Sequence, residues 1–169
     1  MTCQKPIKTG FARLTKPARL GKLFLALLLV IGLLGGHLSA SAHAFRVEVV
    51  KVKTAKGEFF FKTELAMTAQ ERRQGLMFRQ SMGRDEAMLF RWPDRQPVIM
   101  WMKNTKISLD MVFIRKDGHI ANIARSTTPD SLAPVASKGE VVAVLELVAG
   151  TAEQIGLAEG DVVLHRMFR

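Results

Sequence analysis

From residue 45 onward the chain is divided into short runs of alternating apolar and polar residues, and this pattern favours a mainly β fold. The first run, Phe45 to Lys53, reads FRVEVVKVK and alternates with a period of two. That period is typical of a strand with one buried face. A second run, Glu58 to Ala66, follows the turn Ala55-Lys56-Gly57, so the two runs predict a hairpin.

Later segments extend the same pattern. Two capping boxes, Thr68 with Glu71 and Thr151 with Gln154, predict two short helices that end at Gly75 and Gly156. A loop with two prolines is expected from Arg125 to Lys138. Further strands are predicted at Ala87 to Trp92, Val98 to Asn104, Leu109 to Arg115, His119 to Ala124, Glu140 to Val148 and Asp161 to Phe168. The expected fold is a small β-sandwich or closed barrel with two short helices.

The N-terminus predicts export. Six cations and no acid precede a run of twelve apolar residues, Leu23 to Leu34, and small residues follow as far as Ala44. This order is typical of a secretory signal peptide, and the apolar run is shorter than the roughly 20 residues of a membrane-spanning helix. We therefore expect a signal peptide at residues 1–42 and a single β-rich domain at residues 43–169, periplasmic or secreted, that meets the membrane only during export. Cleavage at 42/43, cleavage at 44/45 and an uncleaved anchor remain open.

Charge and cysteine content narrow the classes of function. The chain has 25 basic and 15 acidic residues, but six of the cations precede His43, so the expected mature domain carries a net charge of only +4. Its cations alternate with acids, which argues against a nucleic-acid partner. The one cysteine, Cys3, lies in the expected signal peptide. The mature domain therefore has no disulfide, no thiol catalysis and no cysteine metal site.

Several motifs carry a resemblance to a known family. They are ERRQGLMFR at Glu71 to Arg79, MLF at Met88 to Phe90, WMKNT at Trp101 to Thr105, LD at Leu109-Asp110, LEL at Leu145 to Leu147, AG at Ala149-Gly150 and GD at Gly160-Asp161. Together they resemble the domain of unknown function 192 family over residues 46 to 165. The resemblance implies a mainly β, sandwich-like domain that is often exported and has no assigned catalytic residues. The chain departs from the family pattern at Ala87, Ser108 and Val148, where a glycine and two prolines are usual.

Two carboxylates stand out because their strands are otherwise apolar. Asp110 lies in LDMVFI and Glu146 in VLELV. A buried charge needs a partner, and Arg72, Arg79 and Lys103 are available. We expect at least one of these cations to pair with Asp110 or Glu146. The group is either a polar pocket with ligand-binding or acid–base chemistry, or a structural ion-pair network.

The WMKNT segment supplies further candidates. Trp101 and Lys103 share one face of the expected strand, and Met100, Met102 and Asn104 share the other. Tryptophan beside lysine and asparagine suits a ring-shaped or sugar-like ligand. The alternative places Trp101 in the core and Asn104 in a turn.

The expected mature domain has eight methionines, and thioethers select Cu(I). Met100 and Met102 would form such a metal pair, although methionine is also a common core residue. Histidine support is thin, so we assign no metal site and no cofactor. The sequence also has no GxSxG, no HExxH and no glycine-rich phosphate loop.

The leading hypothesis is a non-catalytic binding module with a polar pocket. Its partner would be an unknown small molecule or envelope component, and the oligomeric state is open. One alternative is an envelope enzyme that uses the paired carboxylates Asp110 and Glu146. The other is a methionine-based copper-binding protein. The candidate ligand-binding residues are Arg72, Arg79, Trp101, Lys103, Asn104, Asp110 and Glu146.

Overall fold

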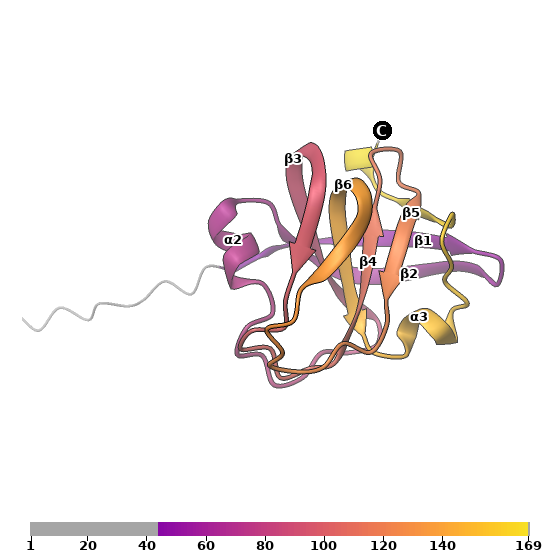
Figure 1. Cartoon of the computed structure of the whole chain (residues 1–169). Coiled ribbons are helices and arrows are strands. Elements are labelled where there is room, and N and C mark those ends of the chain that lie inside the picture. The colour runs from indigo at the N-terminus through magenta and orange to yellow at the C-terminus, as the bar shows by residue number, and fades with distance from the viewer. Residues whose placement is uncertain (1–43, 169) are drawn as a thin grey trace, which may run out of the picture. The chain divides into compact units, whose positions relative to one another are not determined.

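The computed structural model describes residues 44–168, which form one seven-stranded sheet with two short α-helices and a 3-10 turn (Figure 1). The predicted signal peptide lies outside these residues. The strands are β1 (Arg46–Thr54), β2 (Gly57–Ala66), β3 (Glu86–Met100), β4 (Leu109–Ile114), β5 (Ile120–Ala124), β6 (Val135–Val148) and β7 (Val162–Leu164). The helices are α2 (Ala69–Gln74) and α3 (Thr151–Gln154), and the 3-10 turn η1 spans Arg166–Phe168. No helix of residues 44–168 combines the length and the apolarity that crossing a membrane requires.

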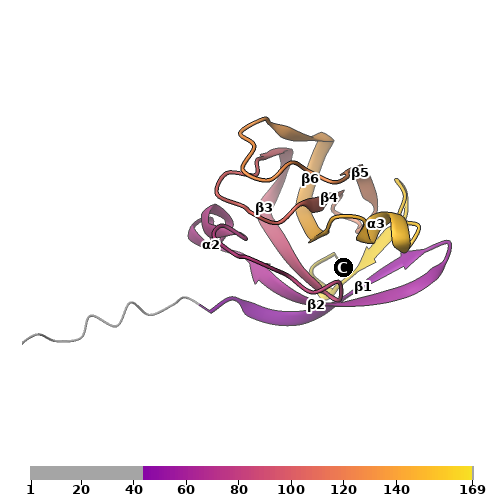
Figure 2. The ribbon, with the colours of Figure 1, turned by 90° about the horizontal axis from the view of Figure 1, so that it is seen from below.

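The sheet has the strand order β5-β4-β6-β3-β2-β1-β7. Only β2 and β3 pair in parallel, and the other neighbours are antiparallel. The sheet curls over α3, as Figure 2 shows from below. A mainly β fold with two short helices is therefore confirmed, in the form of a curled half-barrel.

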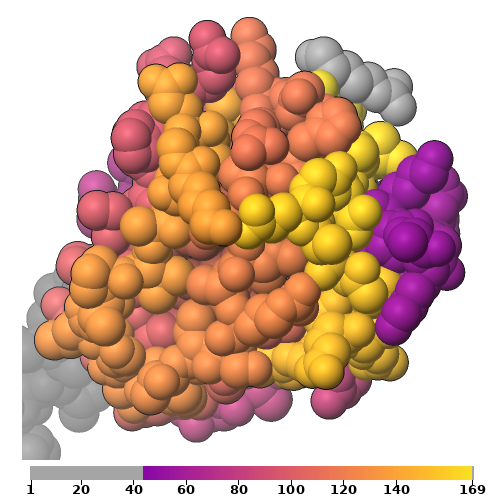
Figure 3. Space-filling model, turned by 45° about the vertical axis from the view of Figure 1, so that its right-hand side comes forward, coloured from indigo at the N-terminus to yellow at the C-terminus, as the bar shows by residue number. Residues whose placement is uncertain are grey.

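The two edges of the sheet meet at one end. His119, just before β5, forms an isolated bridge with Val162 of β7. Val163 donates its backbone N–H to the carbonyl of Gly118 at 2.9 Å, and Ile120 donates to Asp161 at 2.9 Å. A Cβ at Gly118 would lie 2.6 Å from the carbonyl oxygen of Val163, so glycine is required at this close approach. In the space-filling view the C-terminal residues, in yellow, lie between the orange strands and the indigo β1–β2 hairpin (Figure 3).

Two apolar clusters lie on the two faces of the sheet. One cluster joins β1, β2, β4 and β6 to α3 and includes Val52, Leu145 and Ile155. The other lies on the opposite face of β3, β4 and β6 and includes Phe90 and Met111. Alternation along each strand produces this division, because successive side chains point to opposite faces.

The structure differs from the sequence-based elements at four places. Pro93-Asp94, a predicted turn, lies inside the long strand β3, where pairing with β6 is interrupted between Arg91 and Gln96. A proline is tolerated where the ladder is interrupted, because it has no N–H to donate. Strand β3 ends at Met100 rather than Asn104, and β6 begins at Val135, within the expected loop. The capping box of Thr68 and Glu71 is confirmed, but the one at Thr151 is wrong, since Gly150 is the N-cap.

Candidate functional site

A recess of about 400 Å³ opens between α2, β3 and the loop that follows β3. It is lined by Arg72, Arg73, Gln74, Gly75, Leu76, Met77, Phe90, Trp92, Ile99, Met100, Trp101, Lys103, Asn104, Thr105 and Glu146. Both tryptophans of the chain are among these residues. An opening of this size that combines aromatic walls with polar side chains is typical of a small-molecule site.

Glu146 is the one acidic residue that lines the recess within residues 44–168. It lies on β6 between Met88 of β3 and Met111 of β4, and all three side chains are buried. Its carboxyl group forms no hydrogen bond or ion pair with the described residues. Burial raises the pKa of Glu146 to about 8, so the carboxyl is mostly protonated at neutral pH.

Aromatic rings form one wall of the recess. Phe90 and Trp92 project from the same face of β3, and their rings stack with centroids 6.5 Å apart. The Arg72 guanidinium lies over the Trp92 ring, 5.5 Å from its centroid. Arg72 also donates to two backbone carbonyls, at 2.5 Å to Met67 and at 2.7 Å to Arg91. These contacts hold the cation in place beside the wall.

The mouth of the recess is formed by the residues at and just after the end of β3. Trp101 is 56% exposed and Ile99 is 68% exposed, a high value for large apolar side chains. Lys103 Nζ lies 6.0 Å from the centroid of the Trp101 ring. Asn104 has a positive φ of 55°, and its carbonyl accepts the N–H of Phe78 at 2.8 Å. This bond ties the loop after β3 to the segment after α2, and so fixes the two sides of the mouth.

The structure brings together five of the predicted site residues: Arg72, Trp101, Lys103, Asn104 and Glu146 all line the recess. Arg79 does not. Its guanidinium forms a two-pronged ion pair with Glu64 of β2, at 2.8 and 2.7 Å. This hydrogen bonding to Glu64 raises the pKa of Arg79 above its usual value. Arg79 therefore anchors the segment after α2 to the hairpin.

Asp110 is also outside the recess. Its two carboxylate oxygens accept the backbone N–H groups of Ser126 and Ala152, each at 2.9 Å. Asp110 pairs across the sheet with Leu147, whereas Glu146 pairs with Met111, so the two acids point to opposite faces. The paired-carboxylate geometry of the enzyme hypothesis is therefore wrong.

The expected ion pair of this group is wrong as well. Among the described residues, none of Arg72, Arg79 and Lys103 forms a hydrogen bond or ion pair with Asp110 or Glu146. Backbone N–H groups satisfy Asp110, and protonation makes a cation unnecessary for Glu146. The prediction assumed that each acid needs a cationic side chain as its partner, and neither acid has one.

The methionines do not form the predicted pair. Met102 is 1% exposed, and its sulfur accepts the hydroxyl of Thr127 at 3.1 Å. Met100 lines the recess instead, because β3 ends there and the alternation of the strand stops. Among residues 44–168 there is also no group of three or more His, Asp or Glu side chains placed to hold a metal ion.

Phe90, Trp92 and Arg73 belong to the recess and were not predicted. The signal for the two rings is present in the sequence, since Phe90 and Trp92 follow Met88 at every second position of a strand. Their shared face becomes visible only when Pro93 is placed inside β3 rather than in a turn. Arg73 lies in α2, and it lines the recess because this helix forms one side of it.

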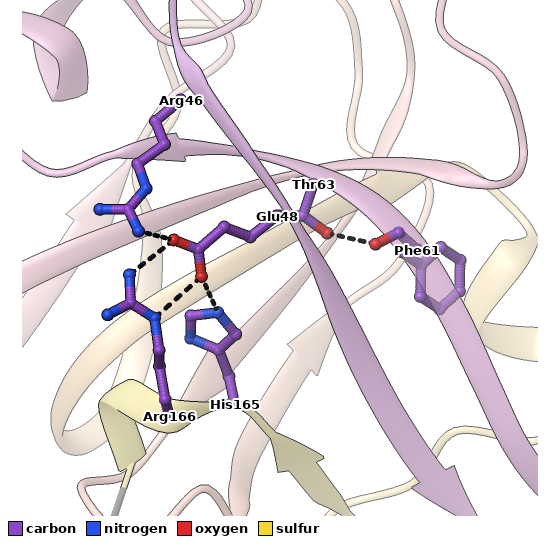
Figure 4. Close-up of polar contacts among 6 residues, drawn as sticks. All are labelled: Arg46, Glu48, Phe61, Thr63, His165 and Arg166. Atoms are coloured by element: carbon purple, nitrogen blue, oxygen red, sulfur yellow. Dashed lines mark hydrogen bonds and ion pairs between the residues drawn. The ribbon is translucent and has the colours of Figure 1, made fainter.

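A second polar cluster lies away from the recess, at the junction of β1 and the C-terminal segment (Figure 4). Glu48 contacts Arg46, His165 and Arg166, with His165 Nε2 at 2.8 Å and Arg166 Nη2 at 2.6 Å. Hydrogen bonding from Arg166, and to a lesser extent from His165, holds the pKa of Glu48 at about 2. His165 Nδ1 is buried and has no hydrogen-bond partner among the described residues. We term these four residues the C-terminal clasp.

Comparisons with known proteins place the chain among uncharacterised relatives. Residues 49–165 match the DUF192 family, described as an uncharacterized ACR. A crystal structure from Sinorhizobium meliloti, described as that of a candidate transcription regulator, is 42% identical, with a TM-score of 0.70 over 72% of this chain and 95% of that one. A protein of unknown function from Novosphingobium aromaticivorans is 34% identical, with a TM-score of 0.71 over 74% of this chain and 89% of that one. A comparison with curated proteins gives no match.

Proposed function

The chain belongs to the DUF192 family, and we propose that it is an exported, non-catalytic module that binds a small molecule in the recess over Glu146. The observation that carries the proposal is the carboxyl group of Glu146, which is buried, without a partner among residues 44–168, and open to the recess. A buried polar group without a hydrogen bond destabilises a fold by roughly 1–3 kcal/mol. A ligand that bonds to this carboxyl removes the penalty when it binds.

A binding role is favoured over catalysis by the composition of the recess. Within the described residues its lining contains no histidine, no serine and no second acid. General acid–base catalysis usually needs a second polar group that takes or delivers a proton. The second carboxylate of the enzyme hypothesis, Asp110, cannot take this part for Glu146, because it lies on the other face of the sheet.

The charges of residues 44–168 do not favour a transcription-regulator role like that in the description of the Sinorhizobium protein. Binding of nucleic acid needs a continuous positive surface. Here many exposed cations are paired with acids, for example Lys51 with Glu58 and Lys138 with Glu159.

The binding role is tested by native mass spectrometry of the mature chain, isolated from the periplasmic fraction of its expression host and incubated with a metabolite extract. The wild type should carry a discrete added mass. Glu146→Leu and Trp101→Ala should lose it, since they remove the buried polar contact and an aromatic surface of the mouth. Lys53→Ala, a change of an exposed residue outside the recess, should retain it. A bound mass that survives both recess changes would place the ligand elsewhere and contradict the proposal.

Export is supported by the basic, apolar and small-residue regions of the N-terminus. N-terminal sequencing of the periplasmic protein should find His43 or Phe45 as the first residue. Recovery of a membrane-bound form that still begins at Met1 would instead indicate an uncleaved anchor.

A further inference from the structure

The charges around the recess all have one sign. Arg72, Arg73 and Lys103 line it, and none of them has a carboxylate partner within residues 44–168. Arg73 and Lys103 are exposed, whereas Arg72 is half-buried and held by two backbone carbonyls. The acid of the recess, Glu146, is buried in an apolar setting that disfavours its anionic form. The recess therefore presents three positive charges and an uncharged acid.

The apolar surface of the recess sets a second requirement for its ligand. Phe90 and Trp92 stack on one side, and the half-exposed Trp101 and the exposed Ile99 extend the apolar surface to the mouth. Aromatic walls of this kind favour a flat apolar body. A cationic body would compete with Arg72 over Trp92 and with Lys103 over Trp101, because both rings already face a cation.

From these two features we propose that the recess takes small molecules with a planar apolar body and an anionic group. The anion lies at the mouth beside Arg73 and Lys103, and the uncharged end faces the carboxyl of Glu146. This inference rests on the proposed binding function and specifies its ligand class. Where the buried end carries an acceptor, the protonated carboxyl donates a hydrogen bond to it, and the long, flexible cations at the mouth adapt to the position of the anion.

The two tryptophans give a direct readout, because both line the recess and the chain has no others. The full-length mature chain, labelled with ¹⁵N, is titrated with three naphthalene probes of matched size. These are 1-naphthaleneacetate, 1-naphthaleneacetamide and 1-naphthylmethylammonium. Shifts of the two indole N–H signals give a Kd for each probe. The acetate should shift both signals and bind about tenfold or more tightly than either other probe, and its affinity should fall as salt is added.

The matched variants are Lys103→Met and Arg73→Met, with Lys53→Met as the control for loss of one charge outside the recess. Each recess change should reduce the preference for the acetate over the amide about three- to tenfold, and Lys53→Met should leave it unchanged. Retained dispersion of the other amide signals shows that each variant is folded.

Each remaining outcome overturns the inference. Tightest binding of the ammonium probe, or equal binding of all three, would show that the recess does not select anions, and would leave the binding function intact. No shift from any probe at millimolar concentration would also reject the ligand class. In that case the mass-spectrometry experiment still decides separately whether the recess binds a ligand.

Discussion

Glu146 and Asp110 occupy nearly adjacent positions in the sheet but have opposite surroundings. Backbone N–H groups hold Asp110, while Glu146 is surrounded by methionines and opens to the recess. The sequence shows two acids in apolar strands and does not show which face each one takes. That depends on the register of β4 with β6, which only the folded sheet fixes.

The raised pKa of Glu146 predicts an unusual dependence of stability on pH. The group titrates near 4.5 in the unfolded chain and near 8 in the folded one, so between these values unfolding releases a proton. The contribution of Glu146 to the stability of the fold is fully present below pH 4.5 and is lost as the pH rises to about 8. Glu146→Gln removes this titration. The variant should therefore be more stable than the wild type by about 3–5 kcal/mol at pH 8 and of similar stability at pH 4.5.

Urea unfolding at pH 4.5, 6 and 8 measures this difference. Glu140→Gln, at an exposed position of β6, is the control. Parallel stability curves for the wild type and Glu146→Gln would show that the carboxyl is not held protonated by burial.

The other site residues were predictable to the extent that they are local in the sequence. Trp101, Lys103 and Asn104 are neighbours in one motif, so they meet at the mouth wherever that segment lies. Arg79 was misplaced because its partner, Glu64, comes from a strand 15 residues earlier. A sequence does not reveal such a pairing without the arrangement of the strands.

Among the elements, α2 has the capping box that its sequence predicts, whereas α3 does not. Thr68 and Glu71 cap α2 within four residues of chain, and the predicted box forms. At α3 the N-terminal N–H of Ala152 is instead accepted by Asp110 of β4. This capping group from a distant strand leaves Thr151 without its predicted role, and its buried hydroxyl has no partner among residues 44–168.

The end of α2 also shapes the recess, which leads to a prediction for Gly75. Its φ is +47°, and a Cβ there would lie 3.1 Å from the ring of Phe90. Gly75→Ala should destabilise the domain by about 1–3 kcal/mol and weaken ligand binding, because the change strains the backbone and displaces a wall of the recess. Thermal unfolding and the indole titration measure the two effects.

Gly150→Ala is the matched control for this prediction. Gly150 has a φ of +82°, but a Cβ there would meet nothing within 4 Å. The Gly150→Ala variant should lose stability through backbone strain but bind the ligand as tightly as the wild type. Equal binding by Gly75→Ala and Gly150→Ala would mean that Phe90 does not depend on the glycine for its position.

At the scale of the whole molecule, the alternating runs were enough to predict a mainly β fold. They were not enough to predict the strand order. Strand β3 lies between β2 and β6, and β7 returns to β1, so neighbours in the sheet are often far apart in the sequence. The joining of the two edges depends on backbone contacts of Gly118 and Val163, for which side-chain patterns carry no signal.

The C-terminal clasp makes the stability of the whole domain sensitive to acid. The pKa of Glu48 is about 2 in the fold and 4.5 in its ordinary state. The stabilisation that it gives is fully present above pH 4.5 and is lost as the pH falls towards 2. Glu48→Gln should therefore lower the urea midpoint at pH 6 and have little effect near pH 2.

The control for the clasp is Glu58→Gln, which removes an exposed ion pair with Lys51 on the same hairpin. It should change the midpoint less than Glu48→Gln, since exposed pairs contribute about 0–1 kcal/mol. A larger loss from Glu58→Gln would show that the clasp does not hold the C-terminal segment.

The pairing of β1 with β7 also determines when the chain completes its fold. Lys51 pairs with Leu164, and Glu48 contacts His165 across 117 positions of the sequence. Contacts of such separation form slowly, because a long loop must close before they stabilise the chain. Until β7 has paired with β1, the two edges of the sheet are not joined. Joining of the two edges is therefore a late step of folding, which follows the pairing of strands that are neighbours in the sequence.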